Sequence, residues 1–133
     1  MNHIKASVSS IKKVESLTLV SFSLGQVSLE MVSLELPSSL KINAFVTLEV
    51  KSSNIILVKE KSNLLITANQ LLCQVSEINN GTLLSSITLK RDNFFLEALI
   101  TLEHSKKLAL KKEEWVIALI NPTELSIIHI DKA

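Results

Sequence analysis

The chain has few of the residues on which most catalytic and metal sites depend. Its 133 residues include one cysteine, two glycines, two prolines, three histidines and no tyrosine. The single cysteine, Cys73, excludes a disulfide within the chain and agrees with a reducing compartment. We expect Cys73 to be a buried, small apolar side chain, because a catalytic thiol needs an electropositive setting and a partner base. No Cys or His partner stands at ligand spacing from His3, His104 or His129, so the sequence predicts no metal site.

Short catalytic and phosphate-binding motifs are also missing. Gly25 and Gly81 are the only glycines, so neither a GxGxxG nor a GxxxxGKS/T phosphate loop can form. No nucleophile elbow and no carboxylate pair stand out in the sequence. We therefore do not expect an enzyme.

Charge and hydropathy exclude two further classes of partner. The net charge is +1, whereas a protein that neutralises many phosphates needs a clear basic excess, so we expect no nucleic-acid partner. The chain has no apolar run long enough to span a bilayer, and its N-terminus lacks the charged-then-apolar layout of a secretory signal. The expected setting is the cytoplasm, away from membranes.

What the sequence does have is the periodicity of β-strands. Hydrophobic residues make up 47% of the chain and charged residues 20%, a balance typical of folded globular proteins. Apolar residues recur at every second position within 27–31, 45–51, 94–100 and 116–120, which is the period of half-buried strands. Two short stretches, 37–40 and 103–108, have a helical or 3₁₀-like pattern. The sequence therefore predicts an all-β fold.

The chain is also duplicated. Residues of the same type recur 67 positions apart in the early part of each half and 70 positions apart in the later part. The matched pairs include Val8 and Val75, Ile11 and Ile78, Gly25 and Asp92, Glu30 and Glu97, Phe45 and Trp115, Val50 and Ile120, and Lys51 and Asn121. The sequence therefore predicts the same order of elements in each half: strand, strand, turn, strand, short helical turn, strand, kink, strand.

Two small barrels are the natural fold for these halves. Each half has roughly 60 residues, near the lower size for independent folding. Five short strands need closure, because open sheet edges invite aggregation. We predict two tandem OB-like five-stranded β-barrels, at residues 1–60 and 65–133, each with a short helical turn. The polar residues 59–63 form the expected linker.

An OB-type barrel can also bind single-stranded nucleic acid, through a basic groove and exposed aromatic platforms. The aromatic residues are Phe22, Phe45, Phe94, Phe95 and Trp115. Phe95 falls on an outward-facing position of its strand. The other four, Phe22, Phe45, Phe94 and Trp115, are expected in the core. An OB-type nucleic-acid-binding module is therefore the weakest of the functional alternatives.

Two stretches in the second half resemble the Mop family of molybdate-binding domains, which are TOBE-like. The first is ITANQL at residues 66–71; the second is ALITLEHSKKLAL at 98–110, followed by VIALINPTEL at 116–125. The family typically shows S-A-R-N-Q-L before a strand hairpin, then I-T-x-x-S and L-x-L, then a strand ending in A-L-I-K-A-S-E-V. Looser counterparts near both ends of the first half extend the similarity. The whole chain resembles a di-Mop protein without a DNA-binding domain.

This resemblance implies oxyanion binding. Mop domains bind molybdate and tungstate in shallow sites, often where two domains or two subunits meet, and they assemble as closed oligomers. The implied function is cytoplasmic binding of molybdate or tungstate for storage or homeostasis, with no other cofactor. The implied assembly is a homo-oligomer: a dimer, a trimer or a larger closed ring. The alternative is an oxyanion sensor or accessory subunit, with a transporter or regulator as its partner.

The resemblance also implies where the oxyanion binds. The implicated residues are Thr67, Ala68, Asn69, Thr101, His104, Lys107, Lys51, Ser52 and Asn121. The family's I-T-x-x-S threonine falls on Thr101, its serine on His104, and the next basic position on Lys107. Thr101 has a second interpretation, because its hydroxyl could simply cap the helical turn that follows. Lysines are most often solvated surface residues, which is the other interpretation of Lys51 and Lys107.

Other positions depart from the family pattern. The arginine of S-A-R-N has no counterpart beside Thr67 and Ala68. The lysine-and-small pair is kept as Lys51 and Ser52 in the first half but becomes Asn121-Pro122 in the second, which loses a charge and a backbone donor. Molybdate is a tetrahedral dianion whose oxygens only accept hydrogen bonds. A fitting site therefore offers N–H groups, hydroxyls and cations, and no carboxylate.

Overall fold

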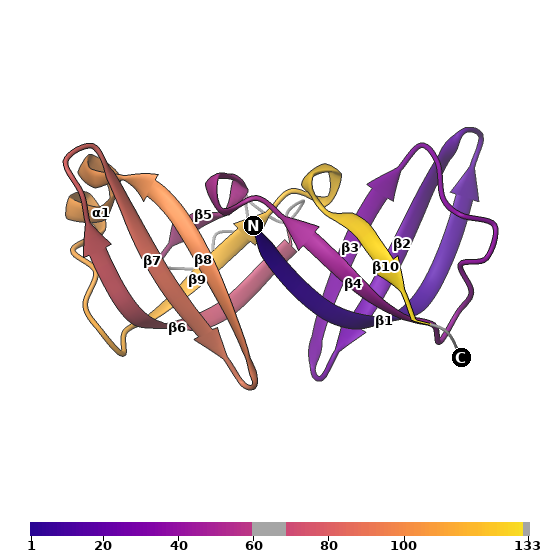
Figure 1. Ribbon diagram of the computed structural model, residues 1–133, viewed down its shortest axis with the longest axis horizontal. Coiled ribbons are helices and arrows are strands. Elements are labelled where there is room, and N and C mark those ends of the chain that lie inside the picture. The colour runs from indigo at the N-terminus through magenta and orange to yellow at the C-terminus, as the bar shows by residue number, and fades with distance from the viewer. Residues whose placement is uncertain (60–68, 132–133) are drawn as a thin grey trace.

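The computed structural model describes residues 1–59 and 69–131, in which the strands form two five-stranded antiparallel sheets. Figure 1 shows these sheets as two lobes side by side. The strands of the first half are β1 (Asn2–Val14), β2 (Leu17–Leu24), β3 (Val27–Ser33), β4 (Phe45–Val50) and β5 (Ile56–Val58). Those of the second half are β6 (Asn69–Asn80), β7 (Leu84–Arg91), β8 (Phe94–Thr101), β9 (Trp115–Ile120) and β10 (Ser126–Ile130). The helical elements are η1 (Ser52–Asn54), α1 (Leu102–Leu108) and η3 (Pro122–Glu124).

Each sheet takes one strand from the other half of the chain. The strand order is β10-β4-β1-β2-β3 in the first sheet and β5-β9-β6-β7-β8 in the second. The last strand of each half thus completes the opposite sheet, as the yellow β10 beside β4 in Figure 1 shows. The predicted division into residues 1–60 and 65–133 follows the sequence repeats and stays a prediction. Residues 60–68, which include most of the predicted linker, lie outside the described residues.

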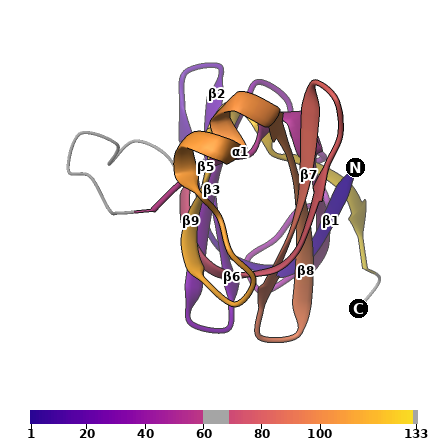
Figure 2. The ribbon, with the colours of Figure 1, turned by 90° about the vertical axis from the view of Figure 1, so that its left-hand side faces the viewer.

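The two halves repeat each other in backbone detail. β1 has a register shift between Val8 and Ser10, and β6 has one at the equivalent place, between Val75 and Glu77. Positive φ angles recur at Gly25 (61°) and Asp92 (48°) in the hairpin turns, and at Asn43 (73°) and Glu113 (69°) before β4 and β9. Seen along the long axis, the strands of both lobes curl around a common centre (Figure 2). The predicted pair of tandem, OB-like β-barrels is confirmed.

The core consists of side chains at alternating positions of both sheets. Phe22 and Leu48 of the first half and Leu71 and Leu89 of the second are fully buried. Cys73 on β6 is also buried, as expected from the sequence. Burial raises the pKa of its thiol to about 11, and the positive charge of Arg91 offsets part of that increase. A thiol held neutral in this way is a poor nucleophile.

Two aromatic residues that were predicted in the core lie on the surface instead. Phe45 is 64% exposed and Trp115 is 54% exposed. Each opens its strand one position before a buried residue, Val46 in β4 and Val116 in β9. Because side chains alternate between the two faces of a sheet, the opening residue points outward. Phe95 is exposed, as its phase predicted.

The two stretches with a helical pattern fold differently. The second forms α1, which begins one residue before the predicted range of 103–108. The first, residues 37–40, forms a single turn in which the N–H of Leu40 donates to the carbonyl of Pro37 at 3.1 Å. Among the described residues, no helix has the length and apolar character needed to cross a bilayer.

Candidate functional site

Two asparagines connect the halves at the centre of the molecule. Asn2, the first residue of β1, accepts a hydrogen bond from the N–H of Glu97 (2.7 Å) and donates one to the carbonyl of Glu97 (2.8 Å). Asn69, the first residue of β6, makes the same pair with Glu30, at 2.8 and 2.9 Å. Both asparagines are buried. Each side chain pairs with the edge strand of the opposite half, β8 or β3, much as a neighbouring strand would.

Asn69 therefore has a structural role at a position predicted to bind the oxyanion. Its side-chain oxygen and nitrogen both contact β3, which leaves the second amide hydrogen for another partner. Its predicted neighbours, Thr67 and Ala68, lie outside the described residues. The sequence did contain a signal for these bridges, because Asn2 and Glu30 each recur 67 positions later.

The Lys51–Ser52 loop lies next to the Asn2 bridge. Val50, at the end of β4, pairs with Asn2 on β1, and Lys51 then leads into η1. The Lys51 side chain is exposed and has no ion pair within the described residues. The backbone N–H groups of Ser52 and Ser53 likewise have no hydrogen-bond partner in this part of the chain. The loop thus presents one cation and two N–H donors to the surface.

A carboxylate borders this loop. The hydroxyl of Ser52 donates to one oxygen of Glu97 (3.2 Å), and the hydroxyl of Ser86 on β7 donates to the other (3.1 Å). The sequence pattern predicted no carboxylate at the site. Because both oxygens of Glu97 accept hydrogen bonds from hydroxyls, this side chain is held in place and orients Ser52.

In the equivalent loop of the second half, the side-chain hydrogen bonds of Asn121 are made within the loop. Asn121 accepts hydrogen bonds from the N–H (3.1 Å) and the hydroxyl (3.0 Å) of Thr123 through its side-chain oxygen. Pro122, which follows it, has no N–H to offer. The two loops meet at the centre of the molecule, where Asn54 of η1 donates to Glu124 of η3 at 2.9 Å. Figure 1 shows these short coils next to each other between the lobes. One loop thus offers a cation and backbone N–H donors, whereas its counterpart offers only the neutral side-chain amide hydrogens of Asn121.

The remaining predicted residues lie on α1 or at its N-terminus, at the outer end of the second lobe. Thr101 caps this helix by accepting a hydrogen bond from the N–H of His104 at 3.1 Å. The ring Nε2 of His104 lies 3.2 Å from the carbonyl of Leu57 and so holds the exchanged strand β5. Lys107 is highly exposed and pairs with Glu103 at 3.3 Å.

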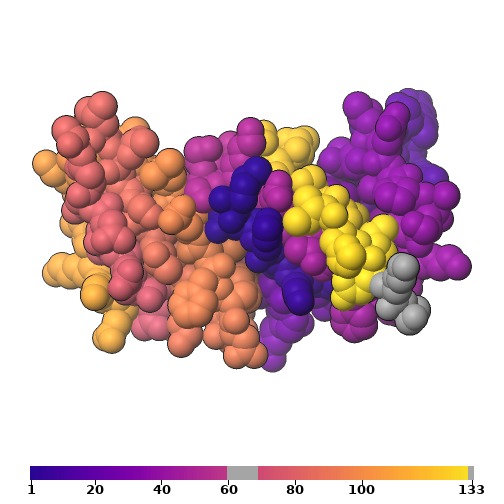
Figure 3. All heavy atoms as spheres, in the orientation of Figure 1, coloured from indigo at the N-terminus to yellow at the C-terminus, as the bar shows by residue number. Residues whose placement is uncertain are grey.

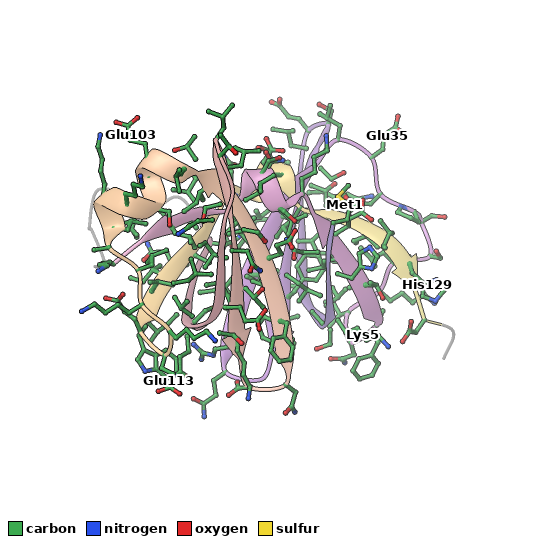
Figure 4. All side chains as sticks on the ribbon, turned by 60° about the vertical axis from the view of Figure 1, so that its left-hand side comes forward. Met1, Lys5, Glu35, Glu103, Glu113 and His129 are labelled. Carbon is green, nitrogen blue, oxygen red and sulfur yellow. The ribbon has the colours of Figure 1, made fainter. Side chains whose placement is uncertain are left out.

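The structure therefore divides the predicted residues into two groups. Lys51, Ser52, Asn69 and Asn121 belong to the junction between the halves, whereas Thr101, His104 and Lys107 belong to the α1 end. Figure 4 shows the two regions, with Glu103 on α1 well away from Met1, the residue before Asn2. In the space-filling view the N-terminal residues lie on the surface between the lobes (Figure 3). At the junction Lys51 and Asn121 are exposed, whereas Asn2 and Asn69 are buried.

The fold and the duplicated junction define a protein of two tandem OB-like β-barrels. Residues 67–127 match the family model of the TOBE domain. The chain is also similar to the cytoplasmic molybdate-binding protein ModG, in a crystal structure with molybdate bound. The similarity has a TM-score of 0.88 and 26% sequence identity, and it covers 95% of this chain and 94% of that chain. No significant match was found among curated proteins. The predicted resemblance to tandem Mop, TOBE-like proteins is confirmed.

Proposed function

We propose that this protein binds molybdate or tungstate in the cytoplasm, for storage or homeostasis of the oxyanion. The observation that carries the proposal is the similarity to molybdate-bound ModG over nearly the full length of both chains. The match to the TOBE domain supports the same conclusion for the second half. The protein acts as a binding protein without catalysis.

The Lys51–Ser52 loop is the best-equipped position for the oxyanion. Molybdate needs only donors, and this loop offers the ammonium group of Lys51 and the N–H groups of Ser52 and Ser53. Glu97 holds Ser52 in position, and its carboxylate opposes an anion, so the donors that favour molybdate here are Lys51 and the two N–H groups. Asn69 can add its second amide hydrogen if the anion lies between the halves.

The α1 end is a second candidate position. The hydroxyl of Thr101 accepts a hydrogen bond as the helix cap and still has its own hydrogen to donate. The ammonium group of Lys107, in the last turn of the same helix, is exposed, although Glu103 neutralises part of its charge. Asn121 contributes least, because it can donate only through its neutral side-chain amide and its loop has no cation.

Assembly with further copies of the chain is part of the proposal. Large apolar side chains on the surface offer contact area for a homo-oligomer. The exposed ones are Met1, Val14, Leu17, Leu34, Ile42, Phe45, Ile56, Leu72, Leu83, Leu84, Phe95, Trp115 and Ile128. An oxyanion sensor that acts on a transporter or regulator remains the alternative function.

Isothermal titration calorimetry with molybdate, tungstate, phosphate and sulfate tests the proposal directly. We expect heat with the first two anions and none with the last two. A site of donors alone leaves the proton of phosphate unpaired, whereas sulfate has no such proton and is disfavoured because it is smaller than molybdate. Several ions bound per chain would favour storage, and a single ion per oligomer would favour sensing. The absence of heat with both molybdate and tungstate at high protein concentration would overturn the proposed function.

A further inference from the structure

A cleft between the halves contains the only arginine of the chain. Gln26, Val27 and Ser28, at the turn and start of β3, line one side of it. Leu72 on β6 and Arg91 on β7 line the other, together with Ile117 on β9. The cleft encloses about 490 Å³, which lies within the range of roughly 300–1,000 Å³ that is usual for small-molecule sites.

Arg91 is fixed where it can bind an anion. One terminal nitrogen donates to the carbonyl of Leu72 at 2.9 Å, and Nε lies 3.6 Å from Asp92, a side chain that is 72% exposed. The Arg91 side chain itself is only 23% exposed. A guanidinium group has five N–H donors in a planar fork, which is more than these two contacts use. None of the residues lining the cleft is acidic.

The duplication shows that this cleft is specific to one side of the molecule. The equivalent of Arg91 is Leu24, and the equivalent of Ser28 is the large side chain of Phe95. Val27 likewise corresponds to Phe94, which packs against the core. On the other side, two phenylalanines thus stand where this cleft has small residues. The cation has also changed place, because Arg91 corresponds to Leu24 whereas the apolar Leu72 corresponds to Lys5.

We infer that the cleft at Arg91 binds a small organic acid, with its carboxylate on the guanidinium fork and its apolar part against Val27, Leu72 and Ile117. Arginine recognises carboxylates through two parallel hydrogen bonds, which fits the partly buried, oriented guanidinium. The apolar lining distinguishes this ligand class from a bare oxyanion, which has no group to place there. This site is separate from the Lys51–Ser52 loop and does not depend on the proposed function.

The test uses the full chain, labelled with ¹⁵N, and sodium benzoate as the probe. Benzoate should shift the backbone amide signals of Gln26, Ser28 and Leu72. The substitution Arg91→Met should weaken benzoate binding roughly 10- to 100-fold, the effect of losing a charge-assisted pair. Ser28→Phe copies the residue of the other half and should block the cleft while leaving Arg91 intact. The control Lys90→Gln removes the neighbouring cation and should leave benzoate binding unchanged.

Several results would overturn the inference. Benzoate shifts that survive both Arg91→Met and Ser28→Phe, in chains with well-dispersed spectra, would place the probe elsewhere. Inorganic phosphate shifting the same amides when benzoate does not would exclude an organic acid. Loss of benzoate binding in saturating molybdate would show that the two share one site. A failure of benzoate to bind leaves the calorimetric test with molybdate intact, so the two proposals fail separately.

Discussion

Asn69 and Glu30 are joined by two hydrogen bonds, 2.8 and 2.9 Å long, that run from one side chain to both backbone groups of a single residue. The side-chain amide of Asn69 thereby makes the two hydrogen bonds that a neighbouring strand would make with the edge strand β3. Asn2 does the same to Glu97 on β8. An unpaired sheet edge is a site of unwanted association, so these bridges close each edge with the other half of the same chain.

Replacing Asn69 with alanine should destabilise the protein. The N–H and carbonyl of Glu30 would lose their partners at a partly buried position, which costs about 2–4 kcal/mol of the free energy of unfolding. Urea denaturation of Asn69→Ala measures this, with Asn79→Ala as the control because that side chain is exposed. Unchanged stability together with lost molybdate binding would show that Asn69 serves the ligand alone.

Replacing Lys51 should affect the ligand and leave the fold intact. Its exposed side chain has no contact to lose among the described residues, whereas a charge-assisted hydrogen bond to molybdate would be removed. We expect Lys51→Ala to weaken molybdate binding roughly 10- to 100-fold with an unchanged melting temperature. Calorimetry and thermal unfolding provide the two measurements. Lys41→Ala, another exposed lysine, is the control, and equal affinities for all three chains would remove Lys51 from the site.

Thr101 has a capping role that the structure shows and a binding role that is proposed. Loss of the helix cap in Thr101→Ala should lower the free energy of unfolding by about 0.5–2 kcal/mol. If the hydroxyl also donates to the oxyanion, the molybdate affinity falls as well. Thr101→Ser keeps the hydroxyl and should restore both properties. If Thr101→Ala reduces the stability but leaves the molybdate affinity unchanged, Thr101 acts only as the helix cap.

The buried thiol of Cys73 predicts a loss of stability in alkaline solution. Its pKa is about 11 in the folded chain against an ordinary value of 9.0, so the folded state keeps the proton that the unfolded state releases. The contribution is therefore complete below pH 9 and disappears as the pH rises from 9 to 11, by roughly 3 kcal/mol. Urea denaturation at several pH values should show a steeper decline for the natural chain than for Cys73→Ala. Parallel declines would mean that the thiol does not titrate differently on unfolding.

The local pattern of the sequence was sufficient to predict the strands and their duplication. It could not predict the exchange of β5 and β10, because these short strands find an equivalent edge in either sheet. The path of the chain through η1 and η3 decides which edge each strand joins. Phe45 and Trp115 were misplaced on the strength of their apolar side chains, although alternation with the buried Val46 and Val116 puts both on the outward face.

The candidate site could be predicted only in part. Family resemblance identified Lys51 and Ser52, which are consecutive in sequence. The carboxylate of Glu97 was missed because it approaches Ser52 from 45 residues away, through the contact between the halves. Asn2 was likewise separated from Glu97 by 95 residues. Contacts of this range depend on how the two lobes dock, which periodicity within a strand does not describe.

The difference between the two central loops can be tested by exchanging their sequences. Copying the first loop into the second, with Asn121→Lys and Pro122→Ser, restores a cation and a backbone N–H and removes the oxygen that now binds Thr123. We expect this double variant to bind more molybdate per chain than the natural protein. The reverse exchange, Lys51→Asn with Ser52→Pro, should remove the stronger binding.

Calorimetric stoichiometry is the measurement that separates the outcomes of this exchange. Pro122→Ala is the matched control, because it restores the N–H without the cation and should gain little affinity. If the reverse exchange leaves the number of bound ions unchanged in a chain that still folds, the oxyanion does not use this loop. The α1 end, with Thr101 and Lys107, would then be the position to which binding must be assigned.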